Sequence, residues 1–293
     1  MIKNIIIGRN SSITRFLCKY LKNTTVLSAN ELSEFILRKE IQKLKKINLI
    51  LNNFYPSKNL NTLKISNFKK LCELSLEKIF FVLDKIPSSK INKIIYTSSA
   101  SIYRISENLN NQHKDTFNRE LYSSFKLAAE KLILNYANNK KKNYFIMRLF
   151  NIYGNPIDQF SFIEKIIRSK KENKKINLIN NGNSIRDFIH VKDIAKVYKK
   201  LIEKKIESGV YDLGTGNGYL IKDIIDFSNF SKSKIVKIDN INELNNSIAQ
   251  NKDLIKVLKN YKFLDLGIYL KKRLGIKKKP IKPILNYVSD NRI

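Results

Sequence analysis

Strand-like and helix-like apolar patterns alternate along the first two-thirds of this 293-residue chain. Short runs rich in Ile, Leu and Val alternate with longer segments whose apolar residues recur at helical spacing. The alternation predicts an α/β fold, in which helices cover a parallel sheet. The expected strands are Ile5–Ile7, Thr25–Leu27, Asn48–Leu51, Lys93–Tyr96 and Tyr144–Leu149. The expected helices are Ile13–Leu21, Glu31–Leu44, Ser66–Ile86 and Tyr122–Ala137.

The rhythm of the pattern changes after Gly154. The expected elements there are helices at Phe160–Lys171, Val191–Glu203 and Ile221–Phe227, strands at Ile176–Ile179 and Val210–Leu213, and a turn at 180–183. The remainder reads as irregular and strongly basic. We therefore expect a first domain over residues 1–154 and a smaller C-terminal lobe over residues 155–293, with some segments crossing back.

The formal net charge of +31 raises the question of nucleic-acid binding. A basic face releases counterions from phosphates, so such a partner is one alternative. The excess is Lys rather than Arg, however, and it accompanies abundant Ile and Asn along the whole chain. We therefore do not expect nucleic acid to be the main partner. A positive field would still attract an anionic small substrate.

The remaining composition points to a cytoplasmic protein without a membrane span. Cys18 and Cys72 are two isolated thiols, which make neither a disulfide framework nor a metal-ligand cluster. No apolar run approaches the roughly 18 residues that cross a bilayer. The apolar N-terminal run is too short for a signal peptide and is expected to form a strand.

The turn after the first expected strand is a candidate dinucleotide site. A dinucleotide fold needs a tight turn here, so that backbone N–H groups at the helix start face a pyrophosphate. We therefore predict a Rossmann-like, doubly wound sheet that binds NADP(H) or NAD(H). The residues expected to bind the cofactor here are Gly8, Arg9, Asn10, Ser11, Ser12 and Ile13. Arg9 could pair with a 2′-phosphate, which slightly favours NADP, and an ordinary strand–helix turn is the alternative.

Tyr122 and Lys126 are a candidate proton-transfer pair. Positions i and i+4 share one face of a helix. A lysine ammonium beside a phenol favours the phenolate and lowers its pKa from about 10. Tyr122 can then give or take a proton at a hydroxyl or carbonyl while hydride moves to or from the cofactor. In a Lys-rich chain, a chance Tyr–Lys pair is the alternative.

Ser98 and Ser99 end the expected strand that precedes this helix. A hydroxyl at the carboxyl end of a strand points into the crevice where α/β proteins bind ligands. Ser99 could hydrogen-bond the substrate oxygen that Tyr122 protonates. Ser99, Tyr122 and Lys126 are therefore the predicted catalytic residues.

Four stretches in this order resemble the NAD-dependent epimerase/dehydratase family, the extended short-chain dehydrogenases that act on nucleotide sugars. They look like the family's serine strand, catalytic helix, domain-joining motif and substrate-lobe motif. In this chain they are Ile94–Tyr103, Tyr122–Lys126, Arg148–Gly154 and Arg186–Asp193, the last followed by Tyr211–Gly216. The ordered set covers roughly residues 1–230.

The resemblance implies a role for each catalytic residue. Ser99 is the hydroxyl partner, Tyr122 the acid and base, and Lys126 the group that lowers the Tyr122 pKa and binds the nicotinamide ribose. It also suggests a homodimer through the long helices around residues 66–86 and 122–137.

Substrate binding is implied at Asn151 and Arg186, which would contact the diphosphate of a nucleotide-diphosphate sugar. A guanidinium supplies the planar donor fork that suits a diphosphate. The alternative for Arg186 is an exposed arginine paired with Asp187. His190 is expected to be a hydrogen-bonded structural histidine.

Several positions depart from the family pattern. Ser11 and Thr14 stand where the second and third glycines of the turn are usual. Asn52-Asn53-Phe54 occupies the place of small residues beside the cofactor, and Arg104 replaces a glycine. These departures leave a catalytically weak NAD(P)-binding regulatory protein as an alternative to an enzyme.

The residues after Ser99 narrow the expected reaction. Family members that eliminate water or decarboxylate have acidic residues there, whereas this chain has Ala100 and Ser101. A 4,6-dehydratase is therefore not expected. Two reactions remain: a 4-keto nucleotide-sugar reductase with external NADPH, and a 4-epimerase that keeps its NAD bound. The weak glycine turn and Arg9 slightly favour the reductase.

Overall fold

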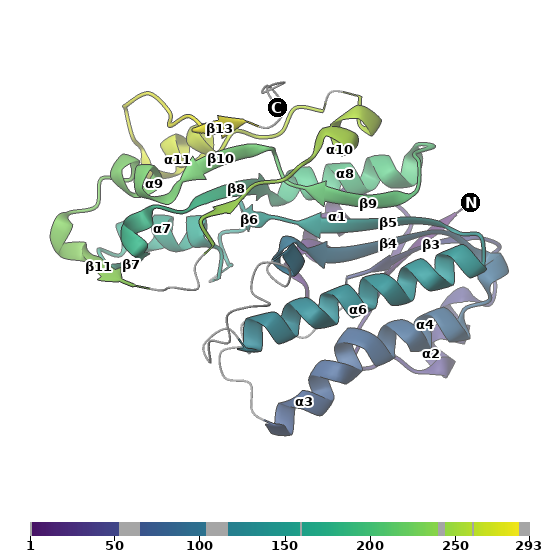
Figure 1. Ribbon diagram of the computed structural model, residues 1–293. Helices are drawn as coiled ribbons and strands as arrows, with labels where there is room; N and C mark the ends of the chain where they lie inside the picture. Colours follow the sequence, from purple (N-terminus) through teal and green to yellow (C-terminus); the bar gives the residue numbers. More distant parts are fainter. Residues whose placement is uncertain are drawn as a thin grey trace. The chain divides into compact units, whose positions relative to one another are not determined.

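The computed structural model describes residues 2–52, 65–103, 117–158, 160–239, 244–259 and 261–286, without the side chains of 65–67 and 117–120 (Figure 1). By its contacts the chain forms two units. Unit 1 comprises Met1–Arg148 and Ala195–Tyr211, and unit 2 comprises Leu149–Ile194 and Asp212–Ile293. Each unit is described by itself below.

Six strands form the sheet of unit 1, in the order β2-β1-β3-β4-β5-β9. Their bounds are β1 Lys3–Ile7, β2 Thr24–Leu27, β3 Ile47–Leu51, β4 Ile91–Ser99, β5 Asn143–Leu149 and β9 Gly209–Leu213. Strand β1 pairs in parallel with β2 and β3, and β3 pairs in parallel with β4. This is the expected Rossmann-like α/β sheet, so the predicted fold class is confirmed. The order reverses between β1 and β3, and ligands of such sheets bind outside the carboxyl ends of the strands at this switch point.

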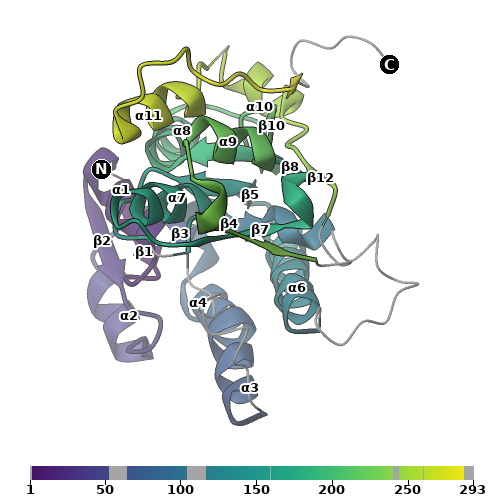
Figure 2. The same cartoon turned by 90° about the vertical axis from the view of Figure 1, so that its left-hand side faces the viewer.

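Helices cover both faces of this sheet. They are α1 Ser12–Tyr20, α2 Glu34–Ile41, α3 Ile65–Cys72, α4 Lys78–Lys85, α6 Phe117–Asn139 and α8 Val191–Glu203, with 3-10 turns at Ser88–Lys90 and Ala100–Tyr103. Figures 1 and 2 show α2, α4 and α6 side by side on one face, with α3 continuing α4. Ile5 and Ile7 of β1 belong to the apolar core on that face, together with Leu37 of α2 and Ile133 of α6. Because successive strand residues point to opposite faces, Ile6 faces away from this core.

Two expectations for unit 1 were wrong in detail. The helix expected over Ser66–Ile86 is interrupted by a π-helical segment, Glu73–Glu77, between α3 and α4. The strand expected over Lys93–Tyr96 runs from Ile91 to Ser99, because Ser98 and Ser99 still adopt strand geometry. The longer strand carries both serines to its carboxyl end.

A buried lysine caps the C-terminal end of α8 by hydrogen bonds to its carbonyl oxygens. Lys93 of β4 donates from Nζ to the carbonyl oxygens of Leu201, Ile202 and Lys204, at 2.7, 2.9 and 2.7 Å. The last carbonyls of a helix have no partner within the helix, and a cation there also complements the helix dipole. Burial lowers the pKa of Lys93, and the three carbonyl contacts compensate its ammonium for lost water.

Three asparagines link neighbouring strands near the amino ends of β1, β3 and β4. Asn48 donates to Oδ1 of Asn4 at 2.9 Å, and Asn92 donates to Oδ1 of Asn48 at 2.8 Å. Asn4 in turn donates to the carbonyl of Lys22 at 2.9 Å. Asn48 is 3% exposed, so its amide depends on these partners rather than on water.

Asn48→Ala is therefore expected to lower the free energy of unfolding by about 1–3 kcal/mol, because it leaves two polar side chains in the row without their partners. Denaturant unfolding of the two proteins measures the difference. The matched control is Asn138→Ala on the exposed side of α6, which should change the value by less than about 0.5 kcal/mol. Equal effects of the two substitutions would contradict the prediction.

Unit 2 contains two small sheets. Strand β8 lies at the centre of one, in the order β12-β8-β10-β13 with β6 also paired to β8, and β7 pairs with β11 in the other. The strands are β6 Asn151–Tyr153, β7 Ile176–Ile179, β8 Ile185–His190, β10 Asn217–Leu220, β11 Ile235–Ile238, β12 Asn246–Ser247 and β13 Leu285–Asn286. The other elements are α7 Phe162–Lys171, α9 Ile221–Phe227, α10 Lys252–Val257, α11 Leu266–Leu274 and 3-10 turns at Asn180–Gly182 and Lys232–Lys234.

The expectation of an irregular C-terminal remainder was wrong. After Phe227 the described residues include two helices, α10 and α11, and three short strands. Leu266 and Leu270 of α11 are buried in the apolar core of unit 2. The many lysines hid this pattern, because few apolar residues suffice for a nine-residue helix that buries one narrow face.

Gly154 makes room for a buried histidine. Its φ is +93°, and a Cβ atom there would lie 2.3 Å from Nε2 of His190. His190 accepts from the Lys192 N–H at 3.0 Å and packs edge-on against the ring of Tyr153, with ring centroids 4.9 Å apart. These contacts agree with the structural role expected for His190, and they require glycine at position 154.

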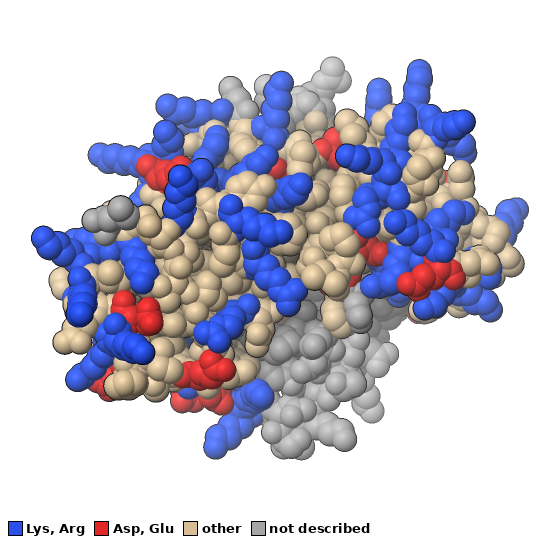
Figure 3. Space-filling view, turned by 180° about the vertical axis from the view of Figure 1, so that it is seen from behind, with Lys and Arg blue, Asp and Glu red and all other residues tan. Residues whose placement is uncertain are grey.

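The positive charge is dispersed. In Figure 3, Lys and Arg side chains of the described residues are spread over the whole visible face among uncharged side chains, with Asp and Glu between them. Such dispersal is typical of solvated helix faces in a Lys-rich chain. That nucleic acid is not the main partner remains a prediction.

Candidate active site

The turn after β1 has the conformation that a phosphate-binding turn needs. Gly8 has a φ of +121°, which favours glycine, and its N–H donates to the carbonyl of Leu27 at 2.9 Å. The Ser11 N–H donates back to the carbonyl of Gly8 at 3.2 Å, and α1 begins at Ser12. The first N–H groups of α1 have no partner within the helix, so they form an anion-binding end.

The residues that replace the two glycines are folded beneath this turn. Thr14 is 2% exposed, and its hydroxyl donates to the carbonyl of Gly8 at 2.8 Å. Asn52, which follows β3, donates to Oγ of Ser11 at 3.0 Å and to Oγ1 of Thr14 at 2.6 Å. The hydroxyls therefore point toward Asn52 and the turn's own backbone. Asn53, Phe54 and Arg104 lie outside the described residues.

Arg9 lies beside an acidic group that the sequence did not locate. Its guanidinium is 3.4 Å from a carboxylate oxygen of Glu31 and 3.4 Å from the carbonyl of Val26. Glu31 follows β2, where dinucleotide folds present an acid to the ribose hydroxyl. Arg9 suits a 2′-phosphate and Glu31 suits a free 2′-hydroxyl, so this pair fits NADP and NAD alike.

Unit 1 brings the three predicted catalytic residues together. Ser99 is the last residue of β4, and its hydroxyl is hydrogen-bonded to the phenol of Tyr122 on α6. Lys126 lies one turn further along α6, with Nζ 5.9 Å from the centre of the Tyr122 ring. Nζ also donates to the carbonyl of Thr97 at 2.7 Å. The Ser101 N–H donates to Oγ of Ser99 at 3.2 Å and helps to fix that hydroxyl.

Burial shifts the pKa values of the pair toward the neutral forms. Burial raises the pKa of Tyr122 to about 12, although the hydrogen bond with Ser99 favours the phenolate. Burial lowers the pKa of Lys126 to about 7, although the carboxylate of Glu130 favours the ammonium. Desolvation disfavours the charged form of each group. The charge of Lys126 therefore depends on the groups that surround its ammonium.

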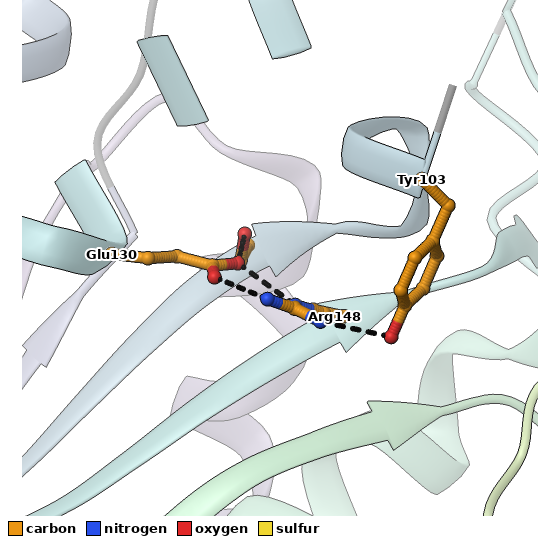
Figure 4. A network of polar contacts seen from close by, with 4 residues as sticks. Tyr103, Glu130 and Arg148 are labelled. Carbon is orange, nitrogen blue, oxygen red and sulfur yellow. Dashed lines mark hydrogen bonds and ion pairs between the residues drawn. The ribbon is translucent and has the colours of Figure 1, made fainter. Parts of the chain in front are cut away.

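A second polar network lies beside this centre, and the sequence reading missed it. Figure 4 shows the carboxylate of Glu130 facing the guanidinium of Arg148, with the Tyr103 phenol on the guanidinium's other side. Arg148 donates to Glu130 from Nε at 3.2 Å and from Nη2 at 2.8 Å, and to the Tyr103 hydroxyl from Nη1 at 3.0 Å. Ser98 donates to the same carboxylate at 2.5 Å. Glu130 follows Lys126 by one helical turn of α6. This spacing is the feature of the sequence that could have indicated that the two side chains are neighbours.

The predicted substrate residues lie on adjacent strands of unit 2. Asn151 of β6 donates from its amide to the carbonyl of Asp187 at 2.9 Å. Arg186 of β8 donates to the carbonyls of Ile185, Leu244 and Asn245, at 2.9, 2.6 and 3.3 Å. Arg186 is 8% exposed, so the alternative of an exposed arginine is wrong. The Arg186 guanidinium is thus hydrogen-bonded to backbone carbonyls of the segment that precedes β12.

Asp187 organises the loop after β9. Its carboxylate accepts from Thr215 N and Oγ1 at 2.9 and 2.6 Å, from Gly216 N at 2.8 Å and from Ala249 N at 3.2 Å. Burial raises the pKa of Asp187 to about 6, although the hydrogen bonds from Thr215, Gly216 and Ala249 lower it. A Cβ at Gly214 would lie 2.5 Å from the carboxylate, so glycine is required at that position.

The described residues show neither a metal site nor a membrane span. They contain no group of three or more His, Cys, Asp or Glu side chains placed to hold a metal ion. No described helix is both long enough and apolar enough to cross a bilayer.

Comparison with known proteins identifies the middle of the chain. Residues 79–214 match the model of the NAD dependent epimerase/dehydratase family. The match includes β4, α6 and β5, the elements that carry the serine strand, the Tyr–Lys helix and the domain-joining motif. The predicted resemblance to this family is confirmed.

Curated relatives are distant and longer than the matched segment. A dTDP-D-glucose 4,6-dehydratase of Dictyostelium discoideum is 26% identical over 198 residues, which span 64% of this chain and 44% of the relative. A CDP-abequose synthase of Salmonella typhimurium is 31% identical over 132 residues, spanning 41% of this chain and 44% of the relative. The chain thus spans less than half the length of these relatives.

Solved structures share the fold over nearly the whole chain. A UDP-N-acetylglucosamine 4-epimerase from Methanobrevibacter ruminantium, in complex with UDP-N-acetylmuramic acid, has a TM-score of 0.72 at 16% identity and covers 94% of this chain and 97% of its own. A UDP-glucuronic acid 4-epimerase from Bacillus cereus, in complex with UDP-glucuronic acid and NAD, has a TM-score of 0.72 at 17% identity, with 94% and 98% covered. At such identity the likeness shows the fold alone.

Proposed function

Because residues 79–214 belong to the NAD dependent epimerase/dehydratase family, we propose that this protein is an NAD(P)-dependent enzyme that modifies a nucleotide-diphosphate sugar. One observation carries the proposal: the hydroxyl of Ser99, at the end of β4, is hydrogen-bonded to the Tyr122 phenol, and Lys126 follows on the same helix face. The free thiols of Cys18 and Cys72 suit a cytoplasmic location.

Each residue of this centre has a chemical task. The Tyr122 phenol donates a proton to a substrate carbonyl oxygen, or its phenolate takes a proton from a substrate hydroxyl. The Ser99 hydroxyl holds the same oxygen by a hydrogen bond. When Lys126 is charged, its ammonium favours the phenolate and so opposes the burial that raises the Tyr122 pKa to about 12. The bound dinucleotide supplies or accepts the hydride.

The turn from Gly8 to Ile13 and the N-terminus of α1 would hold the pyrophosphate of the dinucleotide. The positive φ of Gly8 and the inward hydroxyls of Ser11 and Thr14 support this assignment. Arg9 and Glu31 would meet the adenosine ribose, and they suit NADP and NAD respectively. In unit 2, Asn151 and Arg186 would contact the substrate diphosphate, since the guanidinium fork matches phosphate oxygens.

We infer a 4-keto nucleotide-sugar reductase as the first choice and a 4-epimerase as the second. Ala100 and Ser101 follow Ser99 in a 3-10 turn and supply no acidic group, which argues against a 4,6-dehydratase. The turn in which Ser11 and Thr14 replace two glycines favours an exchangeable dinucleotide and thereby the reductase. The epimerase is supported by structural neighbours of that activity that share the fold.

A homodimer through the helices around residues 66–86 and 122–137 completes the proposal. Phe68 of α3 and Phe80 of α4 are 43% and 58% exposed. Both rings are therefore available for contact with a second copy of the chain.

The purified protein decides between the two reactions. Its absorbance spectrum and mass spectrometry after denaturation reveal any NAD that copurifies, which we expect for an epimerase. For a reductase we expect little copurified dinucleotide, and oxidation of added NADPH only when a 4-keto nucleotide sugar is present. Dinucleotide binding without turnover of 4-keto or C4-epimeric sugar nucleotides would contradict both and leave a regulatory protein.

A further inference from the structure

We propose that Glu130 is a positioning residue of this centre: its buried carboxylate favours the ammonium form of Lys126 and fixes the end of β4 that presents Ser99. The inference rests on the proposed function, because the charge of Lys126 matters for catalysis only if Tyr122 exchanges a proton. It adds a residue outside the predicted set of Ser99, Tyr122 and Lys126.

The helix places Glu130 and Lys126 on one face. They are four residues apart in α6, and residues at that spacing are neighbours on a helix surface. Glu130 is 1% and Lys126 4% exposed, so neither charge is shielded by much water. A buried ammonium loses its hydration and needs a nearby anion to stay charged.

Among the described residues of α6 and β4, three further groups contact Lys126, and none of the three carries a fixed negative charge. Tyr122 and Tyr96 present phenol rings, with centroids 5.9 and 5.0 Å from Nζ. Burial raises the pKa of Tyr96, so this phenol stays neutral. The carbonyl of Thr97 accepts from Nζ at 2.7 Å but is only a dipole. Glu130 is the carboxylate whose field acts on Lys126.

The elements on either side of β4 complete the surroundings. From α8, the Tyr198 hydroxyl is hydrogen-bonded to Oγ1 of Thr97 at 2.7 Å, and burial raises its pKa beyond the range in which it would ionise. From β5, Arg148 is a permanent cation that grips both oxygens of Glu130. The buried cluster thus holds two cations and one anion, and removing the anion leaves Lys126 and Arg148 uncompensated.

Glu130 also acts on the strand. Ser98 donates to its carboxylate at 2.5 Å, and Ser99 follows directly in the chain. The same carboxylate accepts from Arg148, which also donates to the Tyr103 hydroxyl, so the end of β4 is linked through Glu130 to β5. Loss of Glu130 is therefore expected to disturb both the charge of Lys126 and the position of Ser99.

The charge of Lys126 can be measured without turnover. In this chain labelled with ¹³C at lysine Cε, the Lys126 signal is assigned as the one that disappears in Lys126→Arg. We expect this signal to titrate below the pKa of about 10.4 of exposed lysines, because Lys126 is buried. We expect Glu130→Gln to lower the midpoint of this titration by about one pH unit or more, because the field of the carboxylate is lost. In turnover assays the acid limb of alcohol oxidation should move to higher pH, because Tyr122 then loses the ammonium.

The matched control is Glu164→Gln in unit 2. Glu164 is 2% exposed, accepts from the Tyr269 hydroxyl at 2.6 Å and lies 3.5 Å from Arg273, so it is an equally buried Glu–Arg network. We expect this substitution to leave the Lys126 midpoint in place. An unmoved midpoint in Glu130→Gln, or an equal fall in Glu164→Gln, would overturn the proposal.

Arg148→Gln decides the matter if Glu130→Gln does not fold. Without the Arg148 cation, the negative charge of Glu130 is less neutralised and acts more strongly on Lys126. The midpoint of the Lys126 titration should therefore stay or rise, and a fall would overturn the proposal. The titration separates this inference from the proposed function. Suppose that the Lys126 midpoint falls in Glu130→Gln but the protein turns over no nucleotide sugar. The proposed function is then refuted, and the effect of Glu130 on the charge of Lys126 is still supported. Turnover of a nucleotide sugar with an unchanged Lys126 midpoint would support the proposed function and refute the role of Glu130.

Discussion

Tyr122→Phe is expected to lower turnover of the nucleotide sugar by about 10²–10⁴-fold, the usual contribution of a positioned acid or base. The substitution removes only the phenolic oxygen that bonds Ser99, and the ring keeps its place in the apolar core. Dinucleotide binding, measured by titration calorimetry, should change little, because the turn at Gly8 and the N-terminus of α1 are untouched. The loss should therefore appear in kcat rather than in cofactor affinity.

Tyr136→Phe is the matched control for this prediction. Tyr136 lies on the same helix, is half-buried, and its hydroxyl has no hydrogen-bond partner among the described residues. Its removal should leave kcat within about twofold of the wild-type value, since Tyr136 contacts none of the predicted catalytic groups. Full activity of Tyr122→Phe would remove Tyr122 from the mechanism, and an equal loss in both variants would point to general damage of α6.

Asp187→Ala is expected to lower the free energy of unfolding by about 4 kcal/mol, which is large for one substitution. The carboxylate accepts from three backbone N–H groups and one hydroxyl, all buried. Each buried donor left without an acceptor costs about 1–3 kcal/mol, and relaxation of the loop recovers part of the sum. The donors come from residues 215–216 and 249, so their loss should loosen two segments together. Denaturant unfolding with two spectroscopic probes measures the change.

Asp226→Ala is the control for this prediction. Asp226 is exposed on α9 in the same unit, and its removal should change the free energy of unfolding by less than about 0.5 kcal/mol. Asp187→Asn should lie between the two, because the amide keeps one acceptor oxygen but turns N–H groups toward donors. If Asp187→Ala were as mild as Asp226→Ala, the loop after β9 would not depend on this carboxylate.

The proximity of the three predicted catalytic residues could be predicted from the sequence for a physical reason. Tyr122 and Lys126 share a helix face through local spacing alone, and Ser99 lies at the end of a strand that its apolar run reveals. The same helical spacing placed Glu130 beside Lys126, but a glutamate in a helix is usually a solvated residue. Its burial follows from Arg148 and Ser98, which belong to other elements and reach Glu130 only after folding.

For the turn after β1, the structure added more than the sequence could predict. From the sequence, Ser11 and Thr14 were lost glycines that put dinucleotide binding in doubt. The structure places Asn52, from the neighbouring strand, against both hydroxyls and so directs them inward. It also places Glu31 beside Arg9, which removed the reason to prefer NADP that the sequence alone had suggested.

By itself, the sequence predicted the α/β sheet of unit 1, the resemblance to the family and the group Ser99, Tyr122 and Lys126, because these predictions rest on periodicity and on short motifs. Three features were decided only by the tertiary structure. They are the buried network around Glu130, the hydrogen bonds that Asp187 accepts from residues 215, 216 and 249, and those that Lys93 donates to carbonyls at the end of α8. These depend on burial and on polar partners far apart in the chain, and no local pattern records which polar side chain loses its water.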